Sequence, residues 1–139
     1  MLQFHEIFHI FKNFMKFLNA YMHYLVYGNC VKLIHVVAIS GHTEIINIIG
    51  DKSNNPNAAD QLGWTPIHLA AYYGQVEVFK SPIFSSNLQN YIQPLPGGRT
   101  PIKLATQKSH LEVVKIILKI MLENFDTSSD IVLNALNLK

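Results

Sequence analysis

The chain has 139 residues, of which 49% are apolar and 14% charged, and its formal net charge is +2. This length suits one domain with an ordinary core, and so small and diffuse a charge argues against a nucleic-acid-binding surface. Cys30 is the only cysteine, which excludes an intrachain disulfide and a thiolate zinc site and favours a reducing compartment, the cytoplasm or the nucleus.

Residues 1–28 form an aromatic, amphipathic segment. Their longest charge-free window, residues 17–31, is too short to span a bilayer, and no signal-peptide cleavage site is evident. We expect a helix that caps the edge of the following unit, with pairing to a partner helix and adhesion to a membrane surface as alternatives. Three- and four-residue steps separate the apolar positions that predict this helix: Phe4, Ile7, Phe11, Phe14, Leu18, Tyr21 and Leu25.

Residues 5–9 read His-Glu-Ile-Phe-His and match the H-E-x-x-H zinc motif, in which two histidines bind the metal and the glutamate acts as general base. The extended motif would need glycine and histidine where this chain has Lys12 and Met15. Only four residues precede the segment, so no upstream sheet can align a substrate. We therefore expect no catalytic residue, no metal and no cofactor, and a zinc-dependent hydrolase remains only as the enzymatic alternative.

The most informative pattern is an internal repeat with a spacing of 33 to 35 residues. Residues 64–80 read WTPIHLAAYYGQVEVFK, and residues 99–115 repeat the pattern as RTPIKLATQKSHLEVVK. An earlier copy surrounds His35, which lies 33 residues before His68. Units of this kind cannot bury their apolar faces alone, so the repeat predicts a stacked solenoid.

The middle copy carries clear helix signals. Thr65 predicts an N-cap and Pro66 the first helical residue. Gly74 predicts a left-handed C-cap, and a second helix is expected from about Val76. Before them, residues 57–63 predict a turn or finger that leads into the repeat.

The other copies depart from this pattern. The first has Lys32 and Leu33 in place of Thr65 and Pro66, so its helix start lacks both capping signals. In the third, Lys103 replaces the motif histidine and Ser109 replaces the C-cap glycine. Both copies are expected to fold as weaker versions of the middle one.

Proline interrupts the end of the middle copy. Pro82 should stop its second helix after little more than one turn, because proline lacks the N–H and restricts the preceding residue. Residues 81–98 contain three prolines, and we expect an irregular connector there. A short C-terminal helix is predicted at about residues 129–137.

A period of this length, with a Thr-Pro-x-His opening and paired short helices, resembles the ankyrin repeat. The resemblance implies an all-α, ankyrin-repeat-like helical solenoid with short turn and finger connections. It implies that His35 and His68 are structural, and that the function is noncatalytic binding of another protein on a concave face. The expected organisation is an N-terminal helical cap (1–28), three repeats within 29–126 (about 30–62, 63–97 and 98–126) and a C-terminal segment (127–139).

In ankyrin-like folds, the binding positions lie at the finger turn and just after the Leu-Ala-Ala segment. Aromatic and basic residues at these positions favour a partner with apolar anchors and some acidic character. The alternatives are that Trp64 and the tyrosines only cover the core, or that residues 1–28 make the chain a membrane-associated adaptor. The expected partner-binding residues are Ile39, Ser40, Gln61, Leu62, Trp64, Tyr72, Tyr73, Arg99, Gln107 and Lys108.

Overall fold

The computed structural model describes residues 3–26, 33–51, 55–85 and 87–124, and within these ranges the secondary structure is helical, with no strand. The prediction of an all-α solenoid is confirmed. The helices are α1 (Phe4–Val26), α2 (Leu33–Ser40), α3 (Thr43–Asp51), α4 (Pro66–Tyr73), α5 (Val76–Phe79), α6 (Pro82–Ser85), α7 (Gln89–Ile92), α8 (Pro101–Gln107) and α9 (Leu111–Asn124). The predicted C-terminal helix at 129–137 lies outside the described residues.

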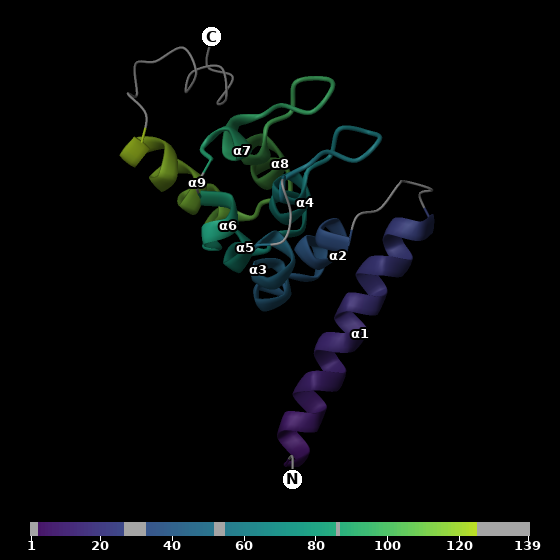
Figure 1. Cartoon of the computed structure of the whole chain (residues 1–139). Helices are drawn as coiled ribbons and strands as arrows, with labels where there is room; N and C mark the ends of the chain where they lie inside the picture. Colours follow the sequence, from purple (N-terminus) through teal and green to yellow (C-terminus); the bar gives the residue numbers. More distant parts are fainter. Residues whose placement is uncertain (1–2, 27–32, 52–54, 86, 125–139) are drawn as a thin grey trace.

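Three helices, α2, α4 and α8, form an inner row, since α4 packs against both of the others. The second helices lie behind them, where α5 contacts both α3 and α9. Two finger loops project from the same side of the row (Figure 1). This is a stack of helix pairs in which each repeat contacts mainly its neighbours.

The middle repeat begins and ends as its sequence predicts. Thr65 is the N-cap of α4, its hydroxyl accepts the backbone N–H of His68, and Pro66 is the first helical residue. Gly74 ends the helix with φ of 72°, in the left-handed region. A side chain there would collide with the imidazole of His110, because a Cβ atom would lie 2.6 Å from its Nδ1. Glycine is therefore required for conformation and for space.

The third repeat has weaker caps and a longer second helix. Pro101 opens α8, but the Thr100 side chain makes no capping hydrogen bond. Ser109 replaces the C-cap glycine and still adopts φ of 60°, which an L-residue does only at a cost. Its second helix, α9, is however 14 residues long and contributes Val113 and Ile117 to the core.

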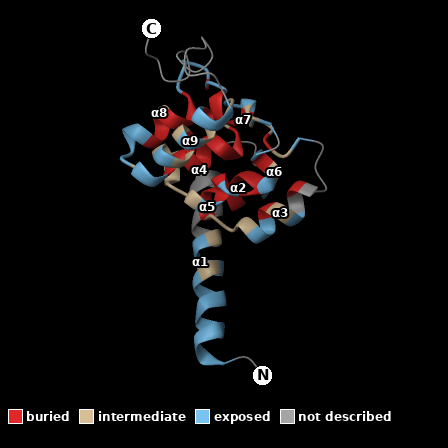
Figure 2. Cartoon of the chain, turned by 90° about the vertical axis from the view of Figure 1, so that its left-hand side faces the viewer, coloured by how far each residue is buried: buried red, intermediate tan, exposed pale blue. Residues whose placement is uncertain are grey.

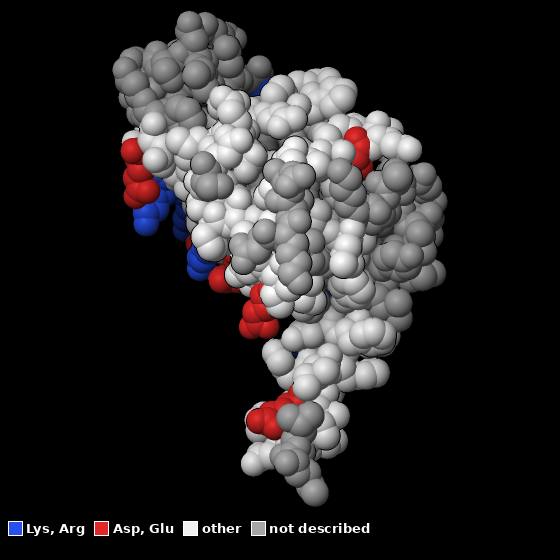
Figure 3. Space-filling view, viewed as in Figure 1, with Lys and Arg blue, Asp and Glu red and all other residues white. Residues whose placement is uncertain are grey.

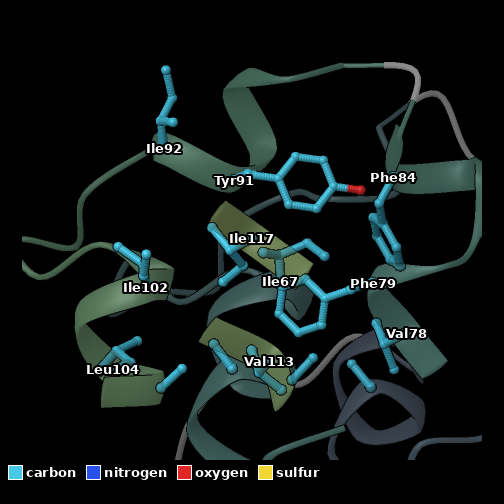
Figure 4. Close-up of a cluster of buried hydrophobic side chains, with 14 of the residues drawn as sticks. Ile67, Val78, Phe79, Phe84, Tyr91, Ile92, Ile102, Leu104, Val113 and Ile117 are labelled. Carbon is cyan, nitrogen blue, oxygen red and sulfur yellow. The ribbon is translucent and has the colours of Figure 1, made fainter. Parts of the chain in front are cut away.

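The connector after α5 is more ordered than predicted. Pro82 ends the continuous helix as expected, but it also begins α6, and α7 follows as a further single turn. Phe84 and Tyr91 from these turns are fully buried against Phe79 of α5 (Figure 4). The prediction of an irregular connector missed these turns, because their aromatic residues show no helical period and find their place only in the tertiary core.

Helix α1 packs against α2 and extends beyond it, away from the repeats (Figures 1 and 2). Phe17 packs on the core, and its ring centroid lies 6.3 Å from that of His42. Asn13 is half-buried, whereas the other residues from 3 to 16 are exposed. The predicted helix is present, but its first half extends into solvent and does not cover the repeats.

Candidate protein-binding surface

Local hydrogen bonds shape the two finger loops. In the first, Asp60 Oδ1 accepts the backbone N–H groups of Leu62 and Trp64, each at 2.9 Å. In the second, the Leu95 N–H donates to the Arg99 carbonyl at 2.8 Å. Trp64 and Arg99 occupy equivalent places, 35 residues apart, at the bases of the two fingers. The carboxylate and the glycine turns thus place them beside the inner helices.

Three aromatic rings extend from the base of the first finger, at Trp64, to the last two residues of α4, Tyr72 and Tyr73. The Trp64 and Tyr72 ring centroids are 5.7 Å apart and nearly perpendicular, and those of Tyr72 and Tyr73 are 5.0 Å apart. Edge-to-face contacts of this kind hold rings rigidly. All three side chains are half-buried, so each keeps part of its surface accessible.

Two cations lie against these rings. The Arg99 guanidinium carbon is 5.9 Å from the Trp64 centroid, and Lys108 Nζ is 4.5 Å from the Tyr72 centroid. Both distances fall within the range of cation–π attraction. We call Trp64, Tyr72, Tyr73, Arg99 and Lys108 the aromatic–cationic cluster.

Two predicted binding residues do not belong to the accessible surface. Ile39 is 6% exposed and Ser40 is 2% exposed. Ile39 packs with Val36 and Leu69 beneath Phe17, Trp64 and Tyr73, and the Ser40 hydroxyl donates to the Val37 carbonyl. The prediction that the binding surface extends to the first repeat was therefore wrong, because helix α2 is covered at these residues, whereas α4 is open at the equivalent positions. Three further predicted residues, Gln61, Leu62 and Gln107, are exposed.

The motif histidines join neighbouring repeats. His35 Nε2–H donates to the Trp64 carbonyl at 3.0 Å, and His68 Nε2–H donates to the Gln93 carbonyl at 2.8 Å. The Thr65 N–H donates to His68 Nδ1 at 3.3 Å, so His68 must be neutral at that nitrogen. Burial lowers the pKa of His68 to about 4, against a smaller opposing effect of its bond to Gln93. These contacts support the structural role that the sequence suggests for both residues.

A second set of bonds runs in the opposite direction along the stack. Gln75 Nε2 donates to the Ile39 carbonyl at 2.7 Å, and His110 Nε2–H donates to the Tyr72 carbonyl at 2.9 Å. His42 occupies the equivalent place in the first repeat and faces α1. Partial burial and Lys16 lower the pKa of His42, while Glu44 and a hydrogen bond to the Asn13 backbone act in the opposite direction. Helix α1 thus takes the position of a preceding repeat.

The His-Glu-Ile-Phe-His segment lies in the first turns of α1, where His5, Glu6 and His9 are exposed. Within the described ranges, no group of three His, Cys, Asp or Glu side chains could hold a metal ion. None of the described helices is long and apolar enough to cross a membrane.

Comparison with known proteins identifies the repeat. The sequence profile for Ankyrin repeats (3 copies) matches residues 9–81 and 34–129. The chain belongs to the ankyrin repeat family. Human Ankyrin repeat and SOCS box protein 3 is 29% identical over 94 residues, which cover 67% of this ankyrin chain and 18% of that protein. Mouse Protein phosphatase 1 regulatory subunit 12A is 39% identical over 74 residues, which cover 53% of the chain and 7% of that protein.

Sequence reasoning found the members of the cluster but not their arrangement. Trp64 and Arg99 share one repeat position, which suggests that they lie near each other. The contact of Lys108 with Tyr72 crosses from one inner helix to the next and depends on the stacking of α4 and α8. The packing of Phe17 against the same core residues as Trp64 was not predicted, since no repeat period relates α1 to the later helices.

Proposed function

We propose that this chain is a noncatalytic interaction module that binds a partner protein across the aromatic–cationic cluster. The observation that carries the proposal is the cluster itself, three part-exposed rings with two cations against them. Tryptophan, tyrosine and arginine are the residues most enriched in interface hot spots. Family membership supports the interaction role. One relative is by name a regulatory subunit.

The chemistry of the cluster favours a partner segment with apolar anchors and acidic side chains. The rings offer flat apolar area that is already ordered, so little side-chain entropy is lost on binding. The two cations attract carboxylates and raise the association rate at low salt. Leu62 and Gln107, which lie close to Trp64 and Lys108 in the sequence, are also exposed.

Affinity capture with mass spectrometry, followed by binding measurements on purified partners, tests the proposal. Trp64→Ala or Tyr73→Ala should weaken partner binding by roughly 2 kcal/mol, which is about thirtyfold in Kd. Lys115→Ala is the control, because Lys115 is exposed on α9, where it pairs with Glu112 rather than with a residue of the cluster. A partner that binds wild type and all three variants equally would rule the surface out.

Because Trp64 also covers Val36 and Leu69, a second pair of variants separates binding from stability. Arg99→Gln and Lys108→Gln remove charge from exposed side chains and should leave the unfolding transition unchanged. They should weaken the binding of an acidic partner severalfold and reduce the salt dependence of its association. Unchanged affinity and salt dependence would show that the cations take no part.

A further inference from the structure

The first half of α1 carries an exposed apolar face that nothing else in the described structure covers. Phe4 is 84% exposed and Phe11 59% exposed. The helix extends away from the repeats, and its exposed part is visible along its length in Figure 2. We call the following residues the α1 stripe: Phe4, Ile7, Phe8, Ile10, Phe11, Phe14 and Met15.

The centre of the α1 stripe faces away from the repeats, whereas its edge at Ile10 lies towards the side of Phe17. Helix α1 touches them through Asn13 and Phe17, which lie one turn apart on the same side of the helix. At 3.6 residues per turn, that side lies about 140° around the helix from Phe11. A flat surface could therefore contact the stripe without meeting the repeats.

The width of the stripe argues against a simple helix pair. At 3.6 residues per turn its members span about half of the helix circumference, from Ile10 to Phe8. A two-helix seam buries a narrower band, whereas a helix that lies in a membrane interface buries about half of its surface. The aromatic composition of the stripe also suits this position, because Phe is typical of the apolar face of interfacial helices.

The charges on α1 also favour a membrane interface as the surface that covers the stripe. The opposite side of the helix carries Lys12 and Lys16, both exposed, together with His5 and His9. Glu6 is the single acidic residue between residues 3 and 26. Lysines placed beside an inserted apolar face attract anionic headgroups, and the attraction falls with added salt.

We propose that the first half of α1 is a docking surface for anionic lipid bilayers, which it binds by lying in the interface with the α1 stripe inserted. The helix does not cross the bilayer. The repeats remain on the water side, and the aromatic–cationic cluster is separate from the lipid-binding face. This site is independent of the proposed protein-binding surface.

Co-sedimentation of the whole chain with vesicles tests the proposal. Vesicles of phosphatidylcholine with about a third phosphatidylserine should bind it, and phosphatidylcholine alone should bind more weakly. Phe11→Ser should lower the partition coefficient at least tenfold, because it removes the central aromatic ring of the stripe. The matched control is Leu122→Ser, since Leu122 is 61% exposed on α9, and it should bind vesicles as wild type does.

Two further measurements decide between occupants. Lys12→Gln with Lys16→Gln should weaken binding to anionic vesicles about tenfold and leave binding to neutral vesicles unchanged. Light scattering should give the same oligomeric state for wild type and Phe11→Ser. Failure of the wild-type chain to bind vesicles would overturn the proposal. If, in addition, the wild-type chain is a dimer that Phe11→Ser dissociates, the stripe is assigned to a second copy of the chain.

Discussion

The middle repeat has a complete first helix and a second helix of four residues, whereas the third repeat has a poorly capped first helix and a second helix of 14 residues. Each repeat is thus strong where the other is weak. The middle repeat has neighbours on both sides, and both are bonded to it, since His35 donates to the Trp64 carbonyl and His110 to the Tyr72 carbonyl. The third contributes apolar area through α9 instead. In a solenoid, stability is shared between adjacent units, so a repeat need not satisfy its motif alone.

The largest contrast is expected at the motif histidine. His68→Ala should destabilise the chain by about 3 kcal/mol or more, because it leaves the Thr65 N–H and the Gln93 carbonyl without their partner in a buried site. Lys103→Ala, at the equivalent position of the third repeat, should change the free energy of unfolding by less than about 0.5 kcal/mol. Urea unfolding followed by circular dichroism measures both. Similar losses would mean that the two repeats do not differ at this position.

Acid should weaken the middle repeat selectively. The folded pKa of His68 is about 4, below the ordinary value of 6.5, so between these values the unfolded chain binds the extra proton. The contribution of His68 to the free energy of unfolding is therefore complete above about pH 6.5. It is lost as the pH falls towards 4, by roughly 3 kcal/mol in total. Unfolding free energies measured across this range should fall less steeply in His68→Ala. Parallel profiles for the two proteins would contradict the assignment to His68.

The C-cap positions should respond in opposite directions. Gly74→Ala should cost about 2 kcal/mol, because a Cβ would meet His110 and the residue would be held in the left-handed region. Ser109→Gly should stabilise the third repeat by about 0.5 kcal/mol, since it removes the same strain. Thermal unfolding of the two variants gives the comparison. A gain from Gly74→Ala would show that the turn tolerates a side chain.

The smallest effect is expected in the connector that supplements the short α5. Tyr91 is fully buried, its hydroxyl has no hydrogen-bond partner among the described residues, and burial raises its pKa to about 12. Tyr91→Phe should keep the ring and remove the unpaired group, which stabilises the chain by at most about 1 kcal/mol. Asn90→Ala serves as the contrast, because Asn90 donates to the Phe84 carbonyl and its loss should destabilise the same turn. A destabilised Tyr91→Phe would indicate that the hydroxyl is bonded in solution.

The sequence predicted the parts of the fold that depend on local chemistry. Thr65, Pro66 and Gly74 act at their own positions in the chain, so their signals carry over directly to the ends of α4. The burial of Phe84 and Tyr91, and the covering of Ile39, depend instead on segments far apart in sequence. No local sequence pattern predicts such contacts. The same reason explains why the cluster residues could be named but not placed.

The hydrogen bonds between repeats run along two separate lines, one at each end of the inner helices. His35 and His68 reach forward to the finger side, while Gln75 and His110 reach back to the turn side. A single line of contacts would act as a hinge about which one repeat could swing against the next. Two lines oppose that rotation, so we expect the inner helices to form a stiff plate. A ligand of that plate meets a preorganised shape, and the conformational entropy lost on binding falls mainly on the ligand.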